Sequence, residues 1–164
     1  MLTQNIQTET KQKKEYSDKD LILCESITRG YLSCKGKKTG EIYRFTNHGD
    51  TCEIEAQDLN GLKASKSAYL YKPLFIIKDE EFLEQPKWKD IKELYQKTVV
   101  NDINDLIDLP NSQFEAALSN LPEGYRDILR DEVATRIHNG TFDSLTKIKI
   151  IDKICGTDLK LLIE

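Results

Sequence analysis

His48 and Cys52 are a histidine–cysteine pair that could suggest nucleophilic catalysis, because a histidine can remove the proton of a nearby thiol. They stand four positions apart across a predicted turn. The alternation of the strand that follows directs Cys52 toward an apolar face, however, and no acidic residue is identified that would orient His48. We therefore interpret His48 as a turn residue and Cys52 as a core thiol, and we expect a protein without catalytic residues.

Two groups of carboxylates could suggest a metal site. Residues 79–81, Asp-Glu-Glu, are consecutive, and Asp102, Asp105 and Asp108 repeat at the spacing of one helix edge. A calcium loop requires oxygens that converge around a central glycine, and neither group has that pattern. We interpret the first group as the start of a helical turn and the second as a solvated helix face, and we expect no metal site.

The four cysteines, Cys24, Cys34, Cys52 and Cys155, also lack the spacing of a zinc site, since no pair has the C-x-x-C pattern. Cys155 lies far from the other three, which argues against two disulfides. The N-terminal residues lack the apolar core of a secretory signal, so we expect a compartment inside the cell. The sequence predicts free thiols that are buried as small apolar groups, and no cofactor.

Residues 36–40, Gly-Lys-Lys-Thr-Gly, invite comparison with a phosphate-binding loop. The motif lacks the spacing of such a loop, and it joins two predicted strands rather than a strand and a helix. Together with Lys35 and Arg44, the residues Lys37 and Lys38 form a possible basic patch that could contact nucleic acid or an acidic partner. The alternative is a solvated hairpin tip.

Composition limits the partners that such a patch could serve. The chain has 164 residues, of which 38% are apolar and 32% charged, and its formal net charge is −4. This acidic balance argues against a general phosphate-binding surface, so nucleic acid is not expected as the main partner. No apolar run approaches the ~20 residues of a membrane-spanning helix, so no membrane partner is expected either.

The predicted secondary structure changes twice along the chain. Residues 1–19 contain few large apolar groups and predict a flexible N-terminal arm, which we expect to become ordered on a neighbouring subunit. Residues 20–85 predict a β-rich module, and residues 86–164 predict a bundle of four or five short helices. The expected fold class is therefore α+β, a small antiparallel sheet followed by a C-terminal helical bundle.

Within the β-rich module, apolar residues alternate with polar ones in segments 31–34, 41–46 and 51–56. Three consecutive segments with this period predict a meander of adjacent strands. Residues 74–77 predict a further strand of the same small sheet. A short helix is expected to begin at Asp58.

Particular residues predict where the C-terminal helices begin and end. Ser112 and Glu115 have the spacing of a capping box, and Asp143 is a plausible N-cap for the helix that follows it. Gly140 and Gly156 stand where helices are expected to end.

Aromatic residues suggest a protein interface. Tyr69, Tyr71 and Phe75 cannot all point inward from one short helix and one strand. Trp88 stands at a predicted helix start and could be an anchor of the core or of an interface. These four residues are the possible interface residues.

Two stretches of the chain resemble small structural proteins of tailed bacteriophages in pattern and spacing. In the β-rich module the resemblance is carried by Tyr43-Arg44-Phe45, Gly49-Asp50, Glu53-Ile54, Asp58-Leu59, Leu62 and Pro73-Leu74-Phe75-Ile76-Ile77. In the helical part it is carried by Leu121-Pro122-Glu123-Gly124-Tyr125, Gly140-Thr141-Phe142-Asp143-Ser144-Leu145, Lys147-Ile148-Lys149-Ile150-Ile151 and Gly156. Together they cover about two thirds of the chain.

The resemblance implies a non-enzymatic virion protein of the head, neck (head–tail connector) or tail, assembled in the host cytoplasm. Its partners would be other virion proteins, and a ring or another homo-oligomer is expected. The alternative is a regulatory adaptor or a nucleic-acid-binding accessory protein that uses the basic hairpin at residues 35–44.

Overall fold

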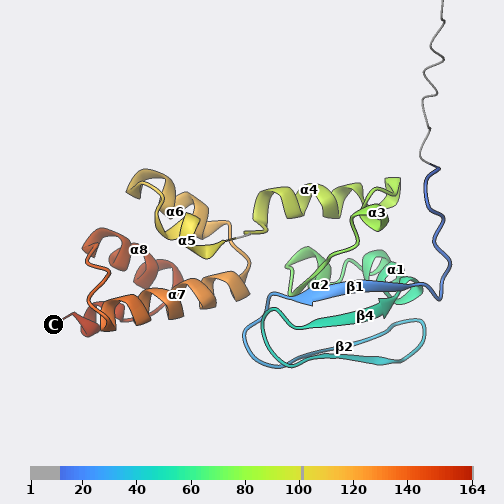
Figure 1. Ribbon diagram of the computed structural model, residues 1–164, viewed down its shortest axis with the longest axis horizontal. Coiled ribbons are helices and arrows are strands. Elements are labelled where there is room, and N and C mark those ends of the chain that lie inside the picture. The colour runs from blue at the N-terminus through green and yellow to red at the C-terminus, as the bar shows by residue number, and fades with distance from the viewer. Residues whose placement is uncertain (1–11, 101, 164) are drawn as a thin grey trace, which may run out of the picture.

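The structure is a computed structural model that describes residues 12–100 and 102–163. It has the expected α+β fold, a small antiparallel sheet followed by C-terminal helices (Figure 1). Most of the predicted N-terminal arm, residues 1–11, lies outside the described residues. Tyr16 is described, and its ring packs edge-on against Phe82 while its hydroxyl donates to Asp79. The chain is therefore already attached to the β-rich module at this point.

The strands form two antiparallel groups rather than one. They are β1 (Leu21–Ser26), β2 (Leu32–Lys35), β3 (Ile42–Phe45), β4 (Thr51–Glu55) and β5 (Phe75–Ile77). A three-stranded sheet has the order β4-β1-β5, and β2 and β3 form a separate hairpin. The predicted strand at residues 74–77 therefore shares a sheet with β4 of the predicted meander, but not with β2 and β3.

The predicted meander is wrong in one pairing, because β4 pairs with β1 and not with β3. The register sets Ile22 opposite Ile54 and Cys24 opposite Cys52. Ile22, Cys24 and Ile54 are all fully buried, so this pairing brings two apolar faces into one core. Alternation tells which face of a sheet a residue occupies, but it does not tell which strand lies beside it.

The helices of the first part are α1 (Ala56–Ala64), α2 (Ala68–Tyr71), α3 (Glu80–Leu83), the 3₁₀ turn η1 (Pro86–Trp88) and α4 (Lys89–Thr98). α1 begins two residues before the predicted start at Asp58, and the Asp58 side chain is fully buried instead of capping the helix. Asp79 does begin the expected helical turn, since its side chain accepts a hydrogen bond from Phe82 N.

The helices of the second part are α5 (Ile103–Ile107), α6 (Asn111–Ser119), α7 (Glu123–His138), α8 (Leu145–Cys155) and the 3₁₀ turn η2 (Leu159–Leu162). The predicted capping box is wrong, because Pro110 is the N-cap of α6 and the helix begins at Asn111. Ser112 therefore lies inside the helix and does not cap it. Ser144, one residue after the predicted Asp143, caps α8. Gly156 ends α8 in the left-handed conformation that glycine adopts readily.

Two hydrophobic cores lie side by side along the molecule (Figure 1). The first joins the inner faces of all five strands to helices α1 to α4, and it includes Trp88 and Ile91. The second joins α5 to α8 and η2. The boundary between the cores thus falls between α4 and α5, C-terminal to the predicted boundary at residue 86.

The two cores meet at the loop after β1 and at β5. Ile27 and Ile76 come from the β-rich module but are buried in the second core. Gly124 at the start of α7 lies so close to this loop that a Cβ atom there would stand 1.8 Å from Ile27 O. A residue without a side chain is therefore required at this contact. Among the described helices, none is long and apolar enough to cross a membrane.

Candidate protein-binding surface

Two of the four possible interface residues are buried, and the other two are half-buried. Phe75 and Trp88 are fully buried, Phe75 stacked on Phe45 and Trp88 packed against Phe82. Both therefore belong to the core and offer no surface to a partner. Phe75 lies on β5, whose three residues are all buried, so strand alternation cannot indicate an exposed face there.

Tyr69 and Tyr71 are half-buried, and both hydroxyls bond within the protein. Tyr69 Oη donates to Ser33 O at 2.7 Å, and Tyr71 Oη donates to Asp90 Oδ2 at 2.8 Å. Tyr71 lines an open groove of about 590 Å³ between α2, α4 and the start of α7. Tyr69 also packs against the buried ring of Phe75, so the four aromatic residues do not form an exposed cluster. The surface of the β-rich module becomes the better candidate.

The glycine-lysine loop at residues 36–40 wraps around the buried carboxylate of Asp58. Lys38 N and Thr39 N donate to Asp58 Oδ1 at 2.8 and 3.0 Å. Thr39 Oγ1 and Tyr43 Oη donate to Asp58 Oδ2 at 2.5 and 2.7 Å. A Cβ on Gly36 would stand 2.2 Å from Asp58 Oδ2, so only glycine fits there. The loop amides that invited comparison with a phosphate site thus bind an internal anion.

Asp58 remains an anion despite its burial. Burial raises the pKa of this carboxyl, but the hydrogen bonds from Thr39, Tyr43 and Lys38 outweigh it and hold the pKa below its usual range. Burial, together with the bond to Asp58, raises the pKa of Tyr43 to about 12. Sequence reasoning missed this role for Asp58, and the only local signal was the loop whose amides needed an acceptor.

Because the loop amides are occupied, the basic side chains are what this hairpin presents. We call Lys35, Lys37, Lys38 and Arg44 the basic hairpin; all four are exposed. Within the described part of the chain, none of them forms an ion pair. The structure thus brings these four predicted residues together on one hairpin, with their charges available.

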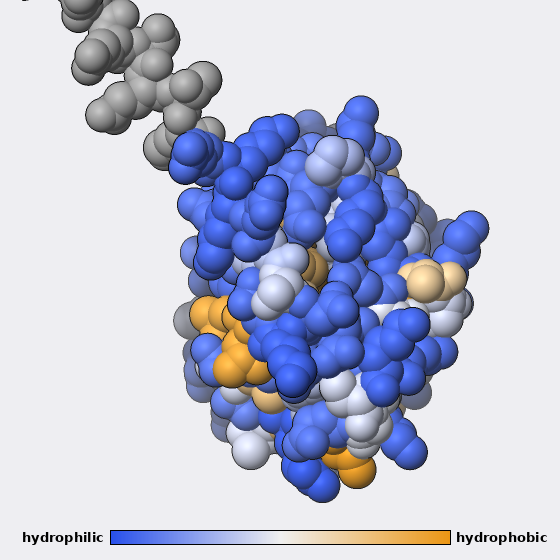
Figure 2. Space-filling view, turned by 90° about the vertical axis from the view of Figure 1, so that its right-hand side faces the viewer, coloured by the Kyte–Doolittle hydropathy of each residue, from blue (hydrophilic) through white to orange (hydrophobic). Residues whose placement is uncertain are grey.

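A second exposed feature lies on the outer face of the three-stranded sheet. Leu21 and Leu23 on the central strand β1 are 57% and 43% exposed. The register places them opposite Glu55 and Glu53 of β4. We call these two leucines and two glutamates the leucine face. Figure 2 views the molecule from the right-hand side of Figure 1, where the surface is mostly hydrophilic and apolar side chains gather in a few places.

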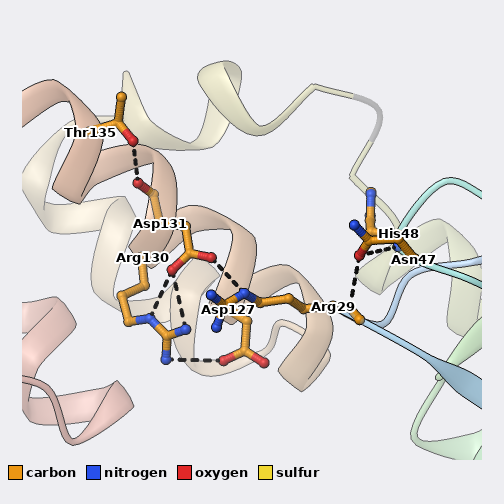
Figure 3. Close-up of polar contacts among 8 residues, drawn as sticks. Arg29, Asn47, His48, Asp127, Arg130, Asp131 and Thr135 are labelled. Atoms are coloured by element: carbon orange, nitrogen blue, oxygen red, sulfur yellow. Dashed lines mark hydrogen bonds and ion pairs between the residues drawn. The ribbon is translucent and has the colours of Figure 1, made fainter.

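Charges at the contact between the cores are compensated, unlike those of the basic hairpin. Arg29 Nε lies 2.8 Å from Asp131 Oδ2, and Arg130 contacts both Asp131 and Asp127 (Figure 3). Asn47 Oδ1 accepts from the backbone N–H of Gly30 at 2.8 Å. We call this contact the joint. Its charges bind one another, so it has a structural role.

His48 and Cys52 do not form a catalytic arrangement. The ring of His48 lies edge-on to the ring of Tyr125, with 6.2 Å between centroids, and burial lowers the pKa of His48. Cys52 is partly buried opposite Cys24, and burial raises the pKa of both thiols. A protonated thiol is a weak nucleophile at neutral pH. Cys52 packs against the first core but is only partly buried, so its interpretation as a core thiol is correct only in part.

The other expected thiols and carboxylates form no site either. All four cysteines are free, but only Cys24 and Cys34 are buried as predicted, whereas Cys52 and Cys155 are partly buried. Burial raises the pKa of Cys34 to about 11. Among the described residues, no group of three or more His, Cys, Asp or Glu side chains is placed to hold a metal ion. Comparison with protein-family models, with curated proteins and with solved structures finds no match for this chain, so its function is argued from the surface itself.

Proposed function

We propose that this protein is a non-enzymatic structural subunit of a tailed-phage virion, in the head, neck or tail, which acts by binding other virion proteins. The virion assignment comes from the resemblance of the two stretches described above, and assembly would take place in the host cytoplasm. The observation that supports an assembly role is the exposure of Leu21 and Leu23 on a central strand.

A central strand usually exposes polar side chains on its solvent face when the sheet has only one covered side. Here Leu21 and Leu23 are two positions apart and so point to the same outer face. Burying apolar surface contributes about 25 cal/mol per Å², so a partner that covers both leucines gains affinity from them. Glu53 and Glu55 beside them favour a partner with basic residues around its apolar contact.

Such a subunit acts through the placement of its binding surfaces. The leucine face and the basic hairpin lie on the same module but carry opposite charges, so they suit different neighbours or opposite ends of identical copies. Contacts between unlike surfaces of identical copies close into rings when the rotation allows it. A ring or another homo-oligomer is therefore part of the proposal.

A second candidate is a regulatory adaptor or nucleic-acid-binding accessory protein. It is favoured by the four exposed residues of the basic hairpin, which have no ion-pair partners among the described residues. The net charge of −4 argues against nucleic-acid binding over a broad surface. Retention of DNA or RNA that falls steeply with salt, and that disappears when the four residues are replaced by glutamine, would favour this candidate.

Co-expression of the full chain with virion head, neck and tail proteins tests the first proposal, with co-elution in size-exclusion chromatography as the readout. We expect a complex with the wild-type chain and loss of that complex in the double variant Leu21→Thr/Leu23→Thr. Threonine keeps the preference for a strand while removing apolar surface. The matched control is Leu145→Thr, since Leu145 is 55% exposed but lies on α8. A wild-type chain that elutes alone contradicts the proposal.

A further inference from the structure

The hydrogen bonds of the β2–β3 hairpin leave one edge of β2 open. Gly36 N donates to Glu41 O at 2.7 Å, and Gly36 O accepts from Gly40 N at 2.9 Å, so both backbone groups of Gly36 point toward the opposite side of the hairpin. Bonded and non-bonded pairs alternate along an antiparallel ladder, which places the bonded pairs at the even-numbered residues of β2. The odd-numbered residues Ser33 and Lys35 therefore direct their N–H and C=O groups away from β3.

No strand occupies this edge within the described residues, where β2 pairs with β3 alone. Ser33 and Lys35 are exposed, and their N–H groups have no hydrogen-bond partner in the described part of the chain. One acceptor is in use, because Tyr69 Oη donates to Ser33 O. A carbonyl oxygen has two lone pairs, so Ser33 O retains a position for a second donor.

The surroundings of the edge indicate the charge of what would bind there. Residues 33–46 contain the four residues of the basic hairpin and a single acidic residue, Glu41. Tyr31, which is 62% exposed, precedes β2 and offers an aromatic ring at the start of the same edge. An extended peptide supplies backbone donors and acceptors in alternation, whereas a nucleic-acid backbone supplies acceptors without that alternation.

We propose that the open edge of β2 binds an extended acidic segment of a partner protein by strand addition. The inference rests on the proposed function, because it names the partner chemistry for one part of the same module. Backbone bonds to Ser33 and Lys35 provide the affinity, and the basic hairpin selects acidic side chains on the incoming strand. Lysine on a free edge also prevents pairing between identical edges, which keeps the site open for a charged partner.

A designed peptide tests this directly with the full chain. The probe is a nine-residue peptide of alternating glutamate and valine with blocked ends, and the control replaces glutamate by lysine. We expect the acidic probe to bind in isothermal titration at low salt and the basic one not to bind. Ser33→Pro should weaken binding at least about tenfold, because it removes an edge N–H without removing a bond to β3. Ser33→Ala should stay within about twofold of the wild-type affinity, since it keeps that N–H.

Amide hydrogen exchange gives a second readout that needs no variant. The N–H groups of Ser33 and Lys35 should exchange more slowly when the acidic probe is added, while those of Leu32 and Cys34, already bonded to β3, stay unchanged. Unchanged exchange at Ser33 and Lys35 at saturation overturns the inference. So does absence of binding by the acidic probe, or displacement of the probe by a single-stranded oligonucleotide that binds more tightly.

The two proposals fail in different ways. If the chain co-elutes with virion proteins but does not bind the acidic probe, the proposed function is supported and strand addition at β2 is refuted. If the chain binds the probe through Ser33 and Lys35 but forms no complex with virion proteins, strand addition is supported and the virion role is refuted.

Discussion

The joint and the basic hairpin both carry clustered charges, but only those of the joint are compensated. At the joint, Arg29 of the β-rich module contacts Asp131 on α7, and Arg130 of α7 contacts the same carboxylate. In the basic hairpin the backbone amides bind the internal Asp58, while the side chains of Lys35 and Arg44 remain exposed. The charges of the joint are thus used within the protein, whereas those of the basic hairpin are available for binding.

The largest effect is expected where the joint is tightest. Gly124→Ala should lower the free energy of unfolding by about 3 kcal/mol, because the new methyl group would overlap Ile27 O and force the two cores apart. Urea denaturation measures the change. Gly140→Ala is the control, since it has open space around it and only its backbone φ of 69° resists the substitution. Equal losses in the two variants would contradict the close contact at the joint.

Replacing Asp58, the anion on α1 that the hairpin loop binds, should have the next largest effect on the free energy of unfolding. Asp58→Ala leaves the N–H groups of Lys38 and Thr39 and the hydroxyl of Tyr43 without their acceptor. We expect a loss of about 2 kcal/mol, measured by urea denaturation. Asp50→Ala is the comparison, because Asp50 also accepts from a backbone N–H, that of Thr46, but in an exposed turn. A similarly small loss in both would show that Asp58 does not organise the loop.

Acid should weaken this same contact. The pKa of Asp58 is lower in the folded protein than in the unfolded chain, so its contribution is present above about pH 4 and is lost as the pH falls through the folded value. Asp58→Asn should therefore show a shallower loss of stability between about pH 4 and pH 2 than the wild type. Thermal unfolding across this range measures the slope. Identical slopes would mean that Asp58 does not titrate differently on folding.

The smallest change in the free energy of unfolding is expected when the unpaired charges of the basic hairpin are removed. Replacing Lys35, Lys37, Lys38 and Arg44 by glutamine should change the free energy of unfolding by less than about 0.5 kcal/mol, because these side chains have no ion-pair partner to lose among the described residues. Arg29→Gln at the joint should cost slightly more, up to about 1 kcal/mol, since it breaks an exposed pair with Asp131. A large loss from the hairpin variant would remove the contrast between the two clusters.

The alternation of apolar residues and the positions of glycine are sufficient to predict much of this fold. Alternation predicts the buried faces of β2, β3 and β4, and glycine predicts the ends of α7 and α8. The partner of β4 is not predictable in this way, because register and neighbour depend on contacts between distant segments. Trp88 was ambiguous for the same reason, since its position at a helix start is compatible with a core or with an interface.

The candidate site is only partly predictable. The basic hairpin follows from composition and a turn motif, and the structure places its residues as expected on an exposed hairpin. Leu21 to Cys24 are four consecutive apolar residues without alternation, so the sequence does not indicate which of them point outward. The burial pattern of β1 shows that Leu21 and Leu23 do. Asp58 looked like a helix start because aspartate is common there, and its true acceptor role needs the loop folded over it.

The assembly role can be tested by mass photometry of the full chain mixed with virion head, neck and tail proteins. We expect a discrete complex of higher mass for the wild type, retained by Leu145→Thr and lost in the double variant Leu21→Thr/Leu23→Thr. A wild-type chain that stays at its own mass of 18.9 kDa in every mixture would contradict the assembly role.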